Sequence, residues 1–133
     1  MRGKIALIAL LFLVIGTNSF SQTNAKLYIV INHASWCKYC KAHGDRVKIA
    51  VNEFASGKEI QVILNDVTDK ESQKKMEPQF KNLGLSEYMN KHHDAAIIYV
   101  FDSKTKKILD GFNIKIPNEE ILTHLKQDLG NLK

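Results

Sequence analysis

Cysteine is scarce in this sequence, which has only two, Cys37 and Cys40, among 133 residues. A disulfide between them would close a very short loop, and a disulfide stabilises a protein least when its loop is short, so a purely structural bridge is disfavoured. Lysine follows Cys40, which excludes the Cys-x-x-Cys-His motif of haem attachment. Two thiols at this spacing can form and reopen a disulfide, and we therefore expect redox chemistry.

Long apolar runs are also lacking. The run Ile5–Ile15 follows Arg2 and Lys4, and it has about half of the roughly 20 residues needed to span a bilayer. Together with the small and polar residues behind it, this run is typical of a secretion signal, and we expect cleavage after Ser21. The alternative is an uncleaved membrane tether. Because residues 1–21 contain no cysteine, they offer no thiol for a lipid anchor.

Neither sign of charge is in strong excess. The chain has 19 basic and 14 acidic side chains, and removal of residues 1–21, which hold two of the basic ones, lowers its net charge from +5 to +3. The lysines are scattered among acids, which is typical of a solvated surface, so we expect no nucleic-acid partner. Residues 22–133 can bury one core and contain no repeat or low-complexity linker. We therefore expect a single exported domain, periplasmic in a bacterium and monomeric.

The apolar patterns predict an α/β domain. Continuous or alternating apolar runs predict strands at Leu27–Asn32, Ile60–Asn65, Ala96–Phe101 and Lys107–Phe112, the last two as a hairpin. Helical spacing predicts helices at Cys37–Phe54, Asp69–His92 and Pro117–Gly130, the middle one interrupted near Pro78 and Leu83-Gly84. The predicted order is β-α-β-α-β-β-α.

This order, with the motif Trp-Cys-Lys-Tyr-Cys at residues 36–40 directly after the first buried strand, resembles the thioredoxin-like superfamily from about residue 26 to residue 129. The resemblance implies a central mixed four-stranded sheet flanked by helices. It also implies that Cys37 is the exposed attacking thiol, that Cys40 is the more buried resolving thiol, and that Trp36 is an apolar substrate contact. Tyr39 is similar to the residue found in exported disulfide-handling members.

Elementary electrostatics supports these roles. A thiol at a helix N-terminus faces unpaired backbone N–H groups and the positive end of the helix dipole, which stabilise a thiolate. Cys37 takes this position, so its thiolate would attack a substrate disulfide and Cys40 would resolve the mixed disulfide. We predict a thiol–disulfide oxidoreductase without a cofactor that acts on protein thiols and disulfides. We expect a reductant, supplied with electrons by a membrane or periplasmic thiol donor, rather than a folding oxidase.

Two positions depart from the family pattern. The family has a cis-proline before the third strand, where this chain has Asp94-Ala95-Ala96. Because a cis bond before a residue other than proline costs about 3–4 kcal/mol, we expect a trans bond and a reshaped loop, with Asp94 and Ala95 as substrate contacts. Ile31 takes the position of a buried acid that in thioredoxins helps to move the proton of the resolving thiol. Water or another group must serve instead.

Two further interpretations stay open, and the first of them depends on the five histidines. His33 and His43 flank the motif, and His92-His93 precede the loop without proline. Two thiolates with one or two imidazoles can bind zinc or copper, so the alternative function is a metal-binding or metal-delivery module. That module would use both cysteines with His33 or His92-His93, whereas the main prediction assigns no metal. A third interpretation is a redox-inactive interaction domain with a vestigial disulfide.

Overall fold

A mixed four-stranded sheet, in the order β2-β1-β3-β4, forms the centre of the computed structural model, which describes residues 24–132. The strands are β1 (Leu27–His33), β2 (Ile60–Asp66), β3 (Ile97–Asp102) and β4 (Ile108–Asn113). β1 pairs with β2 in parallel, and β3 pairs antiparallel with both β1 and β4. The predicted secretion signal, residues 1–21, lies outside the described residues.

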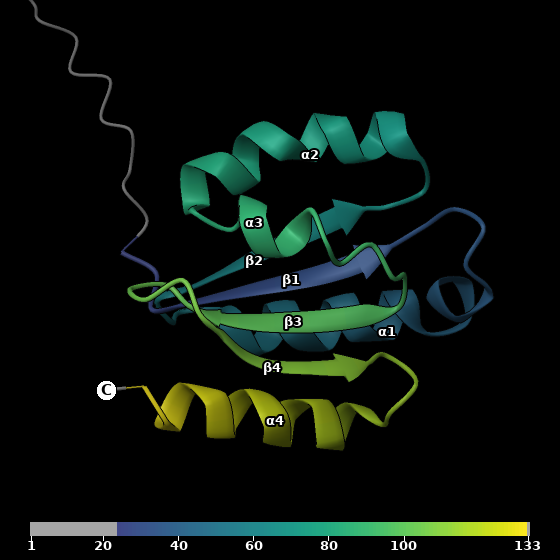
Figure 1. The fold of residues 1–133 in the computed structure, drawn as a ribbon. Coiled ribbons are helices and arrows are strands. Elements are labelled where there is room, and N and C mark those ends of the chain that lie inside the picture. The colour runs from purple at the N-terminus through teal and green to yellow at the C-terminus, as the bar shows by residue number, and fades with distance from the viewer. Residues whose placement is uncertain (1–23, 133) are drawn as a thin grey trace, which may run out of the picture.

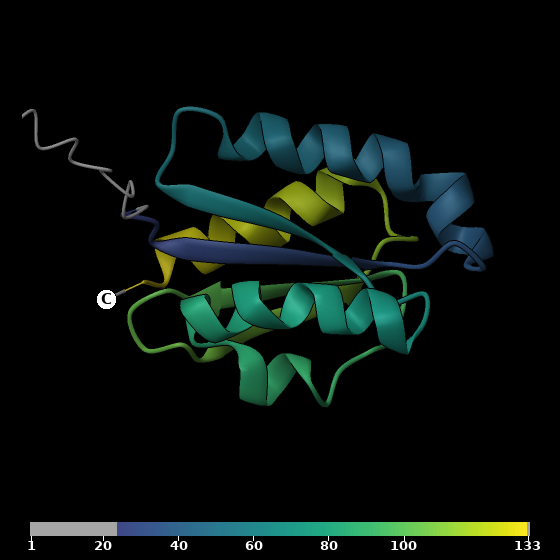
Figure 2. The same cartoon turned by 90° about the horizontal axis from the view of Figure 1, so that it is seen from above.

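Helices cover both faces of this sheet (Figure 1). They are α1 (Lys38–Ala55), α2 (Lys70–Leu83), α3 (Ser86–Met89) and α4 (Asn118–Gly130). Figure 2 shows α1 and α4, in blue and yellow, on one side of the sheet, and α2 and α3, in teal and green, on the other. Within residues 24–132, no helix combines the length and the apolar character needed to cross a membrane. The predicted α/β order is confirmed, with the middle helix divided into α2 and α3.

β1 is the central strand, and it carries the chain to the cysteine motif. Successive side chains of a strand point to opposite faces, so Ile29 and Ile31 pack into the α1 and α4 layer while Tyr28 and Val30 pack into the α2 and α3 layer. Every residue of β1 except His33 is buried. Burial on both faces explains why this strand appears in the sequence as an uninterrupted apolar run.

The ends of α2 follow from capping chemistry, but its interior does not follow the prediction. The Asp69 carboxylate accepts the Ser72 N–H at 2.8 Å at the start of the helix, and Gly84 ends it with a left-handed φ of 74°. The predicted break near Pro78 is wrong, because α2 continues through this residue. Pro78 and Lys74, whose carbonyl loses its helical partner, are both exposed, so water can replace the missing hydrogen bond.

Candidate functional site

Cys37 caps the N-terminus of α1. Its backbone is extended, with φ −82° and ψ 110°, and its Sγ accepts the backbone N–H of Cys40 at 3.1 Å. In this position a side chain meets the unpaired N–H groups of the first helical turn and the positive end of the helix dipole. The structure therefore gives Cys37 the location that the sequence predicted for the attacking thiol.

The exposure of the two thiols is the reverse of the prediction. Both cysteines are free, but Cys37 is buried, with 5 % of its surface exposed, whereas Cys40 is partly exposed. The cap explains this difference, because the Cys37 side chain turns back over the first turn of α1 and joins the same core cluster as Ala34 and Ala96. The prediction of an exposed Cys37 and a more buried Cys40 is wrong.

The surroundings of Cys40 favour its protonated form. Burial raises the pKa of Cys40, and the hydrogen bond and the charge of Cys37 raise it further, while hydrogen bonds with the backbone of Ala34 and Ala96 oppose the rise. A protonated thiol is a poor nucleophile. Cys40 therefore attacks a disulfide only after its proton has been removed.

The loop that carries Trp36 is tied to the loop after β2. The Ser35 N–H donates to Thr68 Oγ1 at 3.0 Å, and Trp36 Nε1–H donates to the Thr68 carbonyl at 2.9 Å. The Asp66 carboxylate in turn accepts hydrogen bonds from the Thr68 N–H and hydroxyl. These contacts hold the Trp36 side chain, 63 % exposed, next to Cys37 in the chain. Its role as a substrate contact stays a prediction.

A buried amide pair anchors the loop before β3. Asn32 Nδ2 donates to the carbonyls of His92 and Asp94, both at 3.1 Å, while its Oδ1 accepts from Asn65 Nδ2 at 2.8 Å. The Asn32 carbonyl also accepts the Ala96 N–H at 2.9 Å. Sequence reasoning missed both asparagines. The signal that could have found them is an asparagine directly after an apolar run, at the second-to-last position of both strands.

The anchored loop has the reshaped backbone that the sequence predicted. The described residues contain no cis peptide bond, so the bond between Asp94 and Ala95 is trans, and the turn is made at Ala96, whose φ of 65° is left-handed. Asp94 is exposed, and Ala95 is half-buried against the core. Burial raises the pKa of Tyr99 to about 12, with smaller contributions from Tyr88 and Asp94. The role of Asp94 and Ala95 in substrate binding stays a prediction.

Two of the histidines considered as metal ligands have other partners. His92 Nδ1 lies 2.6 Å from the Tyr88 carbonyl, and its ring stacks on Tyr88 with centroids 3.8 Å apart. His43 Nδ1 accepts a hydrogen bond from the Arg46 guanidinium. Across residues 24–132, no group of three or more His, Cys, Asp and Glu side chains is arranged to hold a metal ion. The metal alternative, with both cysteines and His33 or His92-His93, gains no support from this geometry.

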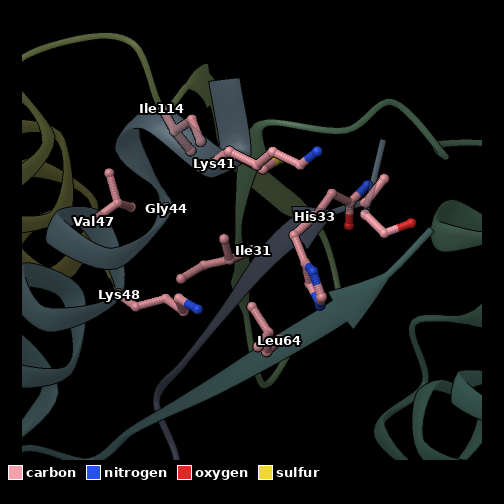
Figure 3. Close-up of a pocket in the computed structure, with 12 residues that line it drawn as sticks. Ile31, His33, Lys41, Gly44, Val47, Lys48, Leu64 and Ile114 are labelled. Carbon is pink, nitrogen blue, oxygen red and sulfur yellow. The ribbon is translucent and has the colours of Figure 1, made fainter. Parts of the chain in front are cut away.

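A cleft of about 230 Å³ lies beside Cys40, between the first half of α1 and the C-terminal ends of β1 and β2 (Figure 3). Its lining includes Ile31 and Leu64, which are partners in the register of β1 and β2. An apolar pair thus occupies the region where the sequence predicted the loss of a buried acid. The cleft has room for water beside Cys40, and water is one of the two substitutes that the sequence required.

Comparison with known proteins identifies the fold. No protein-family model matches the chain, and no curated protein matches its sequence. The structure is similar to a thioredoxin from Fasciola hepatica, with a TM-score of 0.52 and 12 % identity over 80 % of this chain and 84 % of that one. It is also similar to Trxlp from Edwardsiella tarda, with a TM-score of 0.50 and 14 % identity over 80 % and 89 % of the two chains. These similarities confirm the predicted thioredoxin-like fold.

Proposed function

Because the chain has a thioredoxin-like fold with two thiols at the start of α1, we propose that it is an exported thiol–disulfide oxidoreductase that works through Cys37 and Cys40. The observation that carries this proposal is the 3.1 Å hydrogen bond from the Cys40 N–H to Cys37 Sγ. It means that one sulfur caps the helix and the second thiol belongs to the first turn of the same helix. A disulfide can close and reopen across that turn.

The proposed reaction has two steps, attack on a substrate disulfide and resolution of the mixed disulfide. The Cys37 thiolate attacks one sulfur of a protein disulfide, so a bond forms between Cys37 and the substrate while the substrate disulfide breaks and its second sulfur leaves as a thiolate that takes a proton. Cys40 then loses its proton to water and attacks Cys37 Sγ. The internal disulfide forms and the substrate is released as a dithiol, so the substrate gains two electrons and two protons and the cysteine pair loses them.

Burial of Cys37 adds a requirement to the first step. Since its side chain is only 5 % exposed, a substrate reaches Sγ after the side chain rotates out of the cap. The rotation breaks the hydrogen bond from the Cys40 N–H, at a cost of roughly 0.5–1.5 kcal/mol. The loop that carries Trp36 and the loop at Asp94-Ala95 are our candidates for the substrate contacts that favour the open position.

The compartment and the direction of electron flow belong to the same proposal. We propose a periplasmic protein thiol reductant that needs no cofactor, acts as a monomer and receives electrons from a membrane or periplasmic thiol donor. Expression of the full chain with a C-terminal tag in a bacterium, followed by cell fractionation and mass measurement of the N-terminus, tests export. A periplasmic product that begins near residue 22 supports it, and a full-length cytoplasmic product contradicts it.

A redox titration tests the chemistry. The purified protein is equilibrated with glutathione and dithiothreitol buffers, and free thiols are counted by alkylation and mass. A reversible two-electron couple between about −120 and −270 mV supports the proposal, and a value near the lower limit supports a reductant. A pair that stays oxidised below about −300 mV, or stays reduced with a bound metal, refutes it.

Single-cysteine variants complete the test. The Cys40→Ser variant keeps the attacking thiol and should accumulate mixed disulfides with protein substrates, whereas the matched Cys37→Ser variant should not. Serine is a good N-cap residue, so the Cys37→Ser variant keeps the start of α1. Failure of the Cys40→Ser variant to trap any substrate favours the redox-inactive interaction domain.

A further inference from the structure

The two cysteines differ in how a small molecule can approach them. Cys40 is one of the residues that line the cleft between α1, β1 and β2, and Cys37 is not. Cys37 is also the more buried of the two. A molecule small enough to enter the cleft therefore meets Cys40 without any change in the cap of α1.

The cleft has an apolar wall and a basic rim. Ile31, Val47, Leu64 and Ile114 contribute aliphatic surface, and the polar side chains include those of His33, Lys41 and Lys48. Figure 3 shows Lys41 and Lys48 reaching from α1 toward the strands that carry His33 and Leu64. Among the described residues that line the cleft, none is acidic.

Lys41 and Lys48 lie on the same side of α1. They stand seven positions apart, which is two helical turns, so they lie on one face. Lys48 Nζ has one exposed carboxylate 3.6 Å away, that of Asp45, and among residues 24–132 no salt bridge involves Lys41. Two cations beside an apolar wall are complementary to a small molecule that has both an apolar body and negative charge.

The size of the cleft limits what can enter. Its volume of about 230 Å³ is below the roughly 300–1,000 Å³ of pockets that enclose a drug-sized ligand, so it has room for one half of a small disulfide and not for a folded protein segment. We therefore expect protein disulfides to approach from the side of Trp36 and Cys37, neither of which lines the cleft.

We propose that the cleft admits a small anionic disulfide to Cys40. The Cys40 thiolate attacks one sulfur, a mixed disulfide forms at Cys40, and the other half of the small disulfide leaves as a thiolate. Cys37 then attacks the Cys40 sulfur, the internal disulfide closes and the second half leaves. The small disulfide is reduced to two thiols while the cysteine pair is oxidised, so electrons and protons balance. This inference uses the cysteine pair of the proposed function but needs no protein substrate.

Reactivity at Cys40 should depend on pH in a defined direction. Burial and Cys37 raise the pKa of the Cys40 thiol, so its thiolate is scarce at neutral pH. Formation of the mixed disulfide should therefore accelerate as the pH rises above 8. Measurements at pH 8 with two disulfides of opposite charge separate this effect from the charge preference of the cleft, because the thiolate is the same in both reactions.

The experiment uses the full chain with Cys37→Ser, in which Cys40 is the only thiol. Oxidised glutathione is the anionic probe and cystamine the cationic one, and intact mass follows both reactions. Both rates are measured in the folded protein and in urea, where the cleft is lost. The charge preference is the ratio of the anionic to the cationic rate in the folded protein divided by the same ratio in urea. We expect this charge preference to be about five at low salt and to fall at high salt.

Charge variants show whether the cleft lysines cause the preference. Lys41→Glu with Lys48→Glu should abolish it or reverse it, whereas Lys74→Glu with Lys81→Glu, the same charge change on α2 across the sheet, should keep it. Leu64→Trp narrows the cleft and should slow both probes. Equal ratios in folded and unfolded protein, or equal effects of the two double variants, overturn the proposal.

The outcome is independent of the test of the proposed function. If the wild-type protein does not reduce protein disulfides but Cys40 keeps its charge preference, the cleft inference holds and the proposed function fails. If protein disulfides are reduced and the preference is absent, the proposed function holds and the cleft inference fails.

Discussion

Replacement of Asn32 by alanine should lower the free energy of unfolding by about 2–4 kcal/mol. Asn32 is fully buried, and its side chain makes three hydrogen bonds that join β1, β2 and the loop before β3. Alanine leaves the buried Asn65 amide without its acceptor, which costs roughly 1–3 kcal/mol. The carbonyls of His92 and Asp94 lose a donor, but water can reach this loop, so each loss adds only about 0.5 kcal/mol.

Urea unfolding measures this change. The expected loss corresponds to a midpoint lower by about 1–2 M when the slope is near 2 kcal/mol/M. Asn52→Ala is the matched control, because Asn52 is exposed and donates one hydrogen bond, to the Lys48 carbonyl at 2.8 Å. Its cost should stay within about 0.5 kcal/mol. An Asn32→Ala cost no larger than this would refute the reasoning.

A double-mutant cycle tests the network itself. Asn65→Ala removes the group that Asn32→Ala leaves unsatisfied, so the double variant should be more stable than the sum of the single effects by about 1 kcal/mol or more. Strict additivity of the two substitutions would mean that the hydrogen bond between these side chains does not carry the stability of the loop.

Three further outcomes are expected. Burial and the neighbouring Asp110 raise the pKa of Asp128 to about 7, so its stabilising contribution is full below about pH 4 and is lost as the pH rises through 7. In urea unfolding from pH 4 to 8, Asp128→Asn should therefore gain roughly 2–4 kcal/mol relative to wild type, and a constant difference contradicts this. Arg46→Met removes hydrogen bonds to the carbonyls of Ile114 and Ile116 and to Asn118 at the start of α4, and it should cost about 2–3 kcal/mol in urea unfolding; a change below 0.5 kcal/mol would mean that these contacts do not stabilise the fold. Trp36→Phe loses the bond to the Thr68 carbonyl and exposed apolar surface, so insulin reduction should slow severalfold at an unchanged redox potential; an unchanged rate removes Trp36 from the substrate contacts.

The element order and the sheet could be predicted because they depend on local patterns. β1 is covered on both faces, and a strand in that position is mostly apolar, so the sequence shows it as an apolar run. Asp69 and Gly84 mark the ends of α2 by chemistry that acts over a few residues. The interruption at Pro78 was predicted wrongly because the cost of a proline depends on whether water reaches the helix there, and packing decides that exposure.

The spacing of Cys37 and Cys40 and their place after a buried strand were also sufficient to place Cys37 at the start of α1, as the structure has it, whereas the redox chemistry that they predict stays a proposal. Their exposure was not predictable, because Cys37 is buried in a core cluster that also includes Ala96, which lies at the end of a loop held by a hydrogen bond between Asn32 and Asp94, 62 positions apart. The cleft beside Cys40 likewise forms where α1 and β2 meet. Contacts between distant segments leave no periodic signal in a sequence. Only the tertiary structure therefore decided which molecules can reach each thiol.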